Sequence, residues 1–107
     1  NMVLSEAADM KNYIEGVIDT PATTLMEHLI QWQKRDDRPH LKKLGDTPVL
    51  ICAGERDVIT PIEMQKELAK RIPKCTFVKV PQGSHNAHLD MPAFVNHKIK
   101  QFLRSQV

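Results

Sequence analysis

The stretch of sequence that decides the fold is a continuous apolar run, Pro48-Val49-Leu50-Ile51-Cys52-Ala53, which ends at Gly54. Apolar residues that follow one another without alternation predict a strand buried on both faces, as in a parallel sheet. A second, mostly apolar run lies at residues 76–80. Between the two runs, a helical apolar stripe comprises Met64, Leu68, Ala69 and Ile72. Strand, helix and strand over about 30 residues predict a βαβ unit with a right-handed crossover, and so an α/β fold class.

Helices are also predicted on both sides of the βαβ unit. In the first third of the chain, one apolar stripe comprises Met10, Ile14, Val17 and Ile18, and a second comprises Leu25, Leu29 and Trp32. Near the C-terminus, a helix that starts at Pro92 has an inner face of Val95, Ile99, Phe102 and Leu103. We therefore expect residues 1–45 to form a helical segment and residues 46–107 to form a βαβα segment of one structural unit.

Capping patterns mark the starts of three predicted helices. Ser5 is a candidate N-cap for the first. Thr24 with Glu27, and Thr60 with Glu63, each have the spacing of a capping box. Pro21, which precedes the first box, and Pro61, which lies within the second, each suit a first helical position.

Composition and charge exclude several classes of protein. The 107 residues carry 15 Lys and Arg against 13 Asp and Glu, a net charge of +2. This charge is too small to indicate a surface that binds nucleic acid. No apolar run approaches the roughly 20 residues of a membrane-spanning helix, and no signal-peptide pattern is visible. For Cys52 and Cys75, two reduced thiols are favoured over a disulfide. We expect a cytoplasmic protein with no cofactor that binds neither nucleic acid nor membrane.

Two candidate chemical groups follow the two predicted strands. In an open parallel sheet, catalytic groups gather at the carboxyl ends of the strands. Asp57 lies in the loop after the first strand, and His85 lies in the loop after the second. Because these loops lie side by side, the aspartate can hydrogen-bond to the histidine. A carboxylate on an imidazole fixes its tautomer and stabilises the imidazolium that forms when the ring accepts a proton.

These loops resemble those of a known family, the α/β-hydrolases. Residues 47–61 resemble the family's penultimate strand and acid loop, with Asp57 at the position of the catalytic acid. Residues 80–92 resemble its last strand, its histidine loop and the start of its final helix, with His85 at the position of the general base. The acidic residue at Asp90 also matches the family's pattern. The resemblance covers about the last two-thirds of the chain.

The resemblance implies a partial α/β-hydrolase fold, with two parallel strands in a βαβ unit and flanking helices. Within it, residues 1–45 resemble the region that returns from the family's cap to the sheet. It also implies a serine-triad hydrolase that acts on an ester, a thioester or a C–C bond. Its substrate is expected to be a small molecule, bound only by the complete enzyme.

The position of the serines departs from the family's pattern. The family places its nucleophile in a G-x-S-x-G turn upstream of the acid, but Ser5, Ser84 and Ser105 all stand outside such a pattern. Without a nucleophile and an oxyanion hole, a triad loses nearly all its catalytic power. We therefore expect a C-terminal fragment that supplies acid and base and is inactive alone.

The resemblance also has a consequence for partners. The family pairs the strand between Val49 and Ala53 on both edges, whereas this chain offers it one partner strand. An open apolar edge recruits other chains. We expect the chain to dock onto its missing N-terminal half or to form a homodimer through this edge. The homodimer corresponds to the alternative function, a noncatalytic interaction module.

Several alternatives stay open with less weight. Asp57 can be a plain turn residue and His85 a solvated loop histidine. His88 is favoured as a packing or pocket-lining residue. A metal site from His85, His88 and Asp57 has no recognised ligand framework, so no metal is expected. A nucleotide-binding βαβ fragment is disfavoured because no glycine-rich loop follows either strand.

Overall fold

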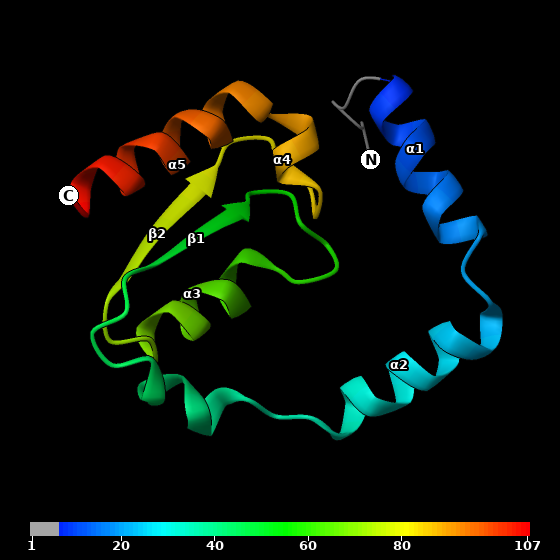
Figure 1. Ribbon diagram of the computed structural model, residues 1–107, viewed down its shortest axis with the longest axis horizontal. Coiled ribbons are helices and arrows are strands. Elements are labelled where there is room, and N and C mark those ends of the chain that lie inside the picture. The colour runs from blue at the N-terminus through cyan, green and yellow to red at the C-terminus, as the bar shows by residue number, and fades with distance from the viewer. Residues whose placement is uncertain (1–6) are drawn as a thin grey trace.

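The computed structural model describes residues 7–107 and shows a mixed α/β fold (Figure 1). The chain begins with helices α1 (Ala7–Ile18) and α2 (Ala22–Lys34) and a short 3-10 helix, η1 (Arg38–Leu44). Both amphipathic helices predicted in the first third are confirmed. The predicted boundary after residue 45 remains a prediction.

The sheet consists of two parallel strands, β1 (Val49–Gly54) and β2 (Cys75–Val80), joined by helix α3 (Ile62–Lys70). The strands pair along their whole length, from Val49 opposite Cys75 to Gly54 opposite Val80. The predicted parallel βαβ unit is therefore confirmed.

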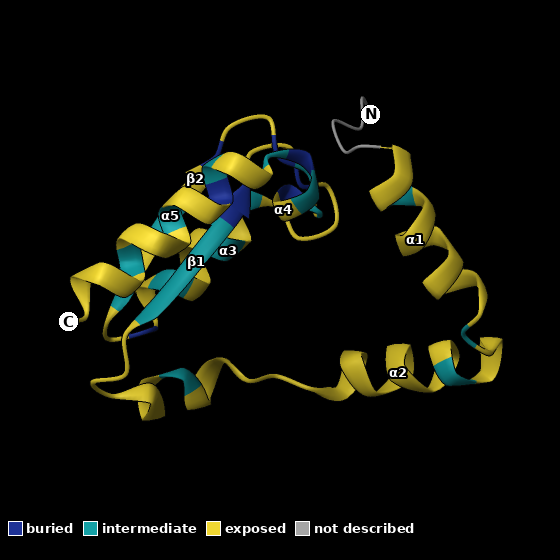
Figure 2. Cartoon of the chain, turned by 45° about the horizontal axis from the view of Figure 1, so that its top comes forward, coloured by how far each residue is buried: buried dark blue, intermediate teal, exposed yellow. Residues whose placement is uncertain are grey.

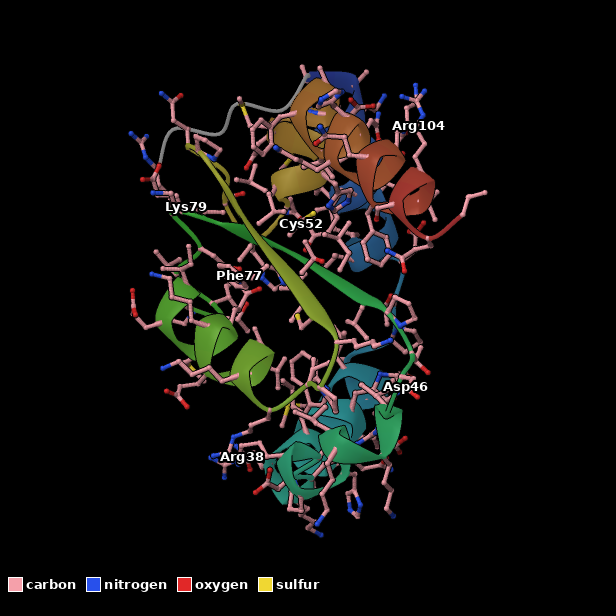
Figure 3. The ribbon with its side chains drawn as sticks, turned by 90° about the vertical axis from the view of Figure 1, so that its left-hand side faces the viewer. Arg38, Asp46, Cys52, Phe77, Lys79 and Arg104 are labelled. Carbon is pink, nitrogen blue, oxygen red and sulfur yellow. The ribbon has the colours of Figure 1, made fainter. Side chains whose placement is uncertain are left out.

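Helices cover both faces of this small sheet. After β2, the chain forms one turn, α4 (Ala87–Asp90), and then the long helix α5 (Pro92–Ser105). Helix α3 packs on one face of the strands and α5 on the other (Figure 1). Cys52 and Phe77 lie on opposite faces (Figure 3). The sequence predicts the start of α5 at Pro92, whereas it gives no sign of α4.

The best-buried residues gather where the two strands end (Figure 2). Ala53 and Val80 are both 0% exposed, and Val80 packs with Ala87 and Val95. The loops that carry Asp57 and His85 leave the sheet at this point. The candidate site therefore stands on the best-packed part of the described chain.

Away from the strand ends, the predicted apolar stripes are less buried than expected. Val49, Leu50, Ile51 and Cys52 are half-buried, because a sheet of two strands has no neighbour on its outer edges. For the same reason the sheet is too narrow to cover the full length of its helices. Met64 and Leu103, both predicted to face the core, are 63% and 58% exposed.

Helices α1 and α2 have no buried residue. They lie apart from the sheet, and their surface is almost entirely exposed (Figure 2). Trp32, on the predicted apolar stripe of α2, is 72% exposed. None of the helices within residues 7–107 has the length and apolar character needed to cross a bilayer.

The predicted capping boxes are not formed. Helix α2 begins at Ala22 and α3 at Ile62, each after a proline N-cap and without a side-chain cap. Thr24 therefore lies inside the first turn of α2, and the hydroxyl of Thr60 bonds to Asp57 instead. Ser5 lies outside the described residues.

Candidate active site

The loop after β1 and the loop after β2 are held side by side at the carboxyl end of the sheet. The Arg56 N–H donates a hydrogen bond of 2.7 Å to the Gly83 carbonyl oxygen. Gly54 permits this close approach, because a Cβ there would lie 2.1 Å from the carbonyl oxygen of Ser84. Residues that face one another across the two loops are thus fixed by the backbone.

Asp57 lies on the first loop and is 8% exposed. Its Oδ1 accepts hydrogen bonds from the backbone N–H groups of Ile59 and Thr60, each at 2.9 Å. Its Oδ2 accepts from the Thr60 hydroxyl at 2.9 Å and from Gln65 Nε2 at 3.3 Å. The His85 ring is the third group at Oδ2, with Nδ1 at 3.1 Å. These bonds fix the orientation of the carboxylate.

Opposing effects set the pKa of Asp57. Burial raises it, because a desolvated carboxylate is costly. Hydrogen bonds from the Thr60 N–H, the His85 ring, the Thr60 hydroxyl and the Ile59 N–H lower it, and together they outweigh burial. The pKa of Asp57 therefore lies below its ordinary value of 3.8, and the carboxyl is ionised at neutral pH.

His85 presents one ring nitrogen to Asp57 and the other to its surroundings. An ionised carboxylate only accepts, so Nδ1–H is the donor in this bond, and in the neutral ring Nε2 then carries the lone pair. The Thr60 hydroxyl oxygen lies 3.4 Å from the same Nδ1. The His85 side chain is 41% exposed, and within residues 7–107 Nε2 makes no hydrogen bond. A histidine so placed can accept a proton from a group outside the described part of the chain.

Residues 7–107 contain two serine hydroxyls and two cysteine thiols as candidate nucleophiles. Ser84 donates its hydroxyl proton to Asp90, and Ser105 donates to the Phe102 carbonyl at 2.6 Å. Cys52 and Cys75 are free thiols, as predicted, and burial raises the pKa of both. None of these groups hydrogen-bonds to His85 in the described residues.

His88, the other histidine of this region, lies in α4 and is exposed. The structure brings Asp57 and His85 together without it. Residues 7–107 contain no group of three or more His, Cys, Asp or Glu side chains arranged to hold a metal ion. The catalytic roles of Asp57 and His85 stay predictions.

Two residues that hold Asp57, Thr60 and Gln65, are not predicted from the sequence. Thr60 was assigned to a helix cap, and Gln65 was given no role. The available signal was local: an aspartate in a loop can accept from the N–H groups two and three residues on, as an Asx turn does. That pattern places Thr60 beside Asp57 before any long-range contact is known.

The comparison with known families covers both loops. Residues 20–106 match the family described as TAP-like protein. This chain belongs to the TAP-like protein family of the α/β-hydrolases. The resemblance on which the sequence analysis relied is confirmed, and so is the α/β-hydrolase fold class.

Individual relatives of this TAP-like chain are hydrolases by name. It is 30% identical over 59 residues to the putative carbamate hydrolase RutD of Caulobacter sp. (strain K31), over 55% of this chain and 22% of that protein. It superposes on a thermophilic esterase from Thermogutta terrifontis with a TM-score of 0.63 and 31% identity, over 65% of this chain and 25% of the esterase. The chain thus spans about a quarter of the length of these relatives.

Proposed function

We propose that this chain supplies the acid and the general base of a serine-triad α/β-hydrolase, with Asp57 as the acid and His85 as the base. One observation carries the proposal: His85 Nδ1 lies 3.1 Å from a buried, ionised Asp57 carboxylate at the carboxyl end of a parallel sheet. Membership of a hydrolase family supports it.

In this proposal, His85 Nε2 takes the proton of a hydroxyl nucleophile as its oxygen attacks a carbonyl carbon. The same proton then passes from the imidazolium to the leaving group. Asp57 keeps the ring in the Nδ1–H tautomer and stabilises the imidazolium. Thr60 and Gln65 contribute by holding the Asp57 carboxylate in one orientation.

The nucleophile and the oxyanion hole are proposed to come from residues outside this sequence. Its three serines do not stand in a G-x-S-x-G turn, and Ser84 and Ser105 are bonded away from His85. The relatives are about four times longer than the matched segment. On this reading the 107-residue chain is a C-terminal fragment and is inactive by itself.

The substrate class follows from the chemistry of the pair. A serine, histidine and aspartate act on a carbon that can form a tetrahedral intermediate, as in an ester or a thioester. One relative is named an esterase and the other a putative carbamate hydrolase, and both bond types contain such a carbon. We propose hydrolysis of small-molecule esters as the leading activity, with thioesters and C–C bonds as the remaining options.

The test is hydrolysis of p-nitrophenyl acetate by two proteins. One is the 107-residue chain, and the other is the gene product extended upstream through a G-x-S-x-G segment. We expect activity only in the extended protein, with losses of roughly a thousandfold or more on Asp57→Ala or His85→Ala. The matched controls are Asp46→Ala and His97→Ala, both at exposed positions, which should stay within about twofold.

Three results would overturn the proposal. Robust hydrolysis by the 107-residue chain alone would show that the nucleophile is inside it. An upstream reading frame without G-x-S-x-G would remove the proposed nucleophile. Full activity of His85→Ala in the extended protein would remove the base.

A second candidate function is an interaction module that dimerises through β1, and one observation favours it. In the described residues β1 pairs only with β2, so its other edge is open. Val49 N–H and Glu55 N–H donate towards β2, and strand alternation turns the N–H of Leu50 to the open edge. We propose that the occupant of this edge is the N-terminal half of the hydrolase, and a second copy of this chain is the competing outcome.

Leu50→Pro tests whether either occupant uses this edge, because proline removes a donor on the open edge and leaves the β1–β2 bonds in place. Mixing this chain with the separately produced upstream half should restore esterase activity, and Leu50→Pro should abolish that recovery. A chain that sediments as a dimer, and as a monomer after Leu50→Pro, would favour the module. A folded monomer at high concentration that does not bind the upstream half would contradict both.

A further inference from the structure

We propose that Asp90 is a positioning residue that fixes the backbone on both sides of His85. Asp90 ends α4 and is 6% exposed. It is one of two buried charged residues in the described part of the chain, and Asp57 is the other. A carboxylate withdrawn from water is costly unless donors surround it, and two of the donors to Asp90 come from the histidine loop.

Those donors belong to a residue next to His85. Asp90 Oδ2 accepts the backbone N–H of Ser84 at 2.7 Å and the Ser84 hydroxyl as well. The Ser84 oxygen in turn accepts the N–H of Asn86 at 3.1 Å. The residues before and after His85 are thus tied to one carboxylate oxygen, the first directly and the second through one hydroxyl.

The backbone of Asp90 also bonds to the histidine loop. The Asp90 N–H donates to the carbonyl of Asn86 at 3.0 Å. The side chain of Asp90 therefore bonds to Ser84 and its main chain bonds to Asn86, so both hold the segment that contains His85. The single turn of α4 connects this segment to Asp90. In this arrangement the Ser84 hydroxyl is a bridge, because it donates to Asp90 and accepts from the Asn86 N–H.

Such an anchor matters because packing alone does not hold the ring. The His85 side chain is 41% exposed, so its orientation towards Asp57 depends on where the backbone puts it. One buried carboxyl oxygen that accepts both the N–H and the hydroxyl of Ser84 is an effective anchor for this backbone. A displacement of about 1 Å in a catalytic group can cost a hundredfold in rate.

The significance for catalysis rests on the proposed function, but the anchoring itself can be measured without activity. The experiment is NMR on the 107-residue chain, with amide exchange at positions 84 and 86 and the ¹⁵N shifts of the His85 ring as readouts. Asp90→Ala removes the anchor, and Ser84→Ala removes only the bridge. Asp46→Asn, at an exposed carboxylate, is the matched control.

In Asp90→Ala we expect exchange at both amides to accelerate roughly tenfold or more, since each loses a partner or its support. The His85 ring should shift from the Nδ1–H tautomer towards a mixture. Ser84→Ala should accelerate exchange mainly at Asn86, and Asp46→Asn should change neither readout. If Asp90→Ala does not fold, Ser84→Ala alone decides the matter.

Unchanged exchange and tautomer in a folded Asp90→Ala or Ser84→Ala chain would overturn the proposal. Failure of the hydrolase assignment looks different, because it appears as retained activity of His85→Ala in the extended protein. In that protein, Asp90→Ala should lower kcat about tenfold or more at nearly constant KM. Rescue by Asp90→Glu, which keeps the carboxylate, would separate anchoring from general loss of stability.

Discussion

The close approach of the two loops at Gly54 predicts a large effect of one added methyl group. In Gly54→Ala, the new Cβ would lie 2.1 Å from the Ser84 carbonyl oxygen and 2.6 Å from that of Gly83. Both atoms are backbone, so neither can rotate away, and the two loops must separate. We expect a loss of about 3 kcal/mol, the upper end for overpacking. For a chain of this size, that lowers Tm by roughly 10–15 °C.

Gly16→Ala is the matched control, because a Cβ at Gly16 meets nothing within 4 Å. Gly16 lies inside α1, where alanine is the better helix former by up to about 1 kcal/mol. Thermal unfolding followed by far-UV circular dichroism should therefore show a large fall in Tm for Gly54→Ala and none for Gly16→Ala. A Gly54→Ala chain that unfolds within about 3 °C of the unchanged protein would refute the close approach of the loops.

Three further predictions concern Asp57 and the core. Thr60→Val removes a donor to Asp57, so it should raise the pKa of Asp57 towards its ordinary value and lower the free energy of unfolding in urea by about 1 kcal/mol. An unchanged ¹³C titration of Asp57 would contradict this. Because folding lowers the pKa of Asp57, the ionised carboxylate stabilises the fold fully above pH 3.8, and this stabilisation is lost as the pH falls through the pKa of the folded state. Asp57→Asn should remove this part of the acid sensitivity of the urea midpoint, and an unaltered acid profile would count against it. Val80→Ala should lower the free energy of unfolding by about 2 kcal/mol and Leu103→Ala by under about 0.5 kcal/mol, since these residues are 0% and 58% exposed. Equal shifts in the urea midpoint would contradict the placement of the core around Val80.

The βαβ unit and the meeting of Asp57 with His85 were predictable from short-range patterns. The continuous apolar run before Gly54 is typical of a strand with helices on both faces, and its length suits a strand better than a helix. Parallel strands end at the same edge, so residues that follow each of them must be neighbours. Both inferences depend on chain geometry and need no knowledge of side-chain contacts.

The finer structure of the site was not predictable in this way. The single turn of α4 is held by the buried Asp90, and a one-turn helix has too few residues to show a period. Thr60 stands at a position that suits a helix cap equally well, and only the fold decides that its hydroxyl bonds to Asp57. Likewise, periodicity predicts that α2 is a helix, but it does not predict that Trp32 is left 72% exposed.

If Asp57 and His85 act as one acid–base unit, the losses that follow their removal cannot be independent. The most direct test is a double-mutant cycle on ester hydrolysis by the extended protein, with Asp57→Ala, His85→Ala and the double variant. We predict that kcat/KM of the double variant lies within about threefold of the more damaged single variant, as in groups that work together. Losses that multiply in the double variant would contradict the pairing of Asp57 with His85 in catalysis.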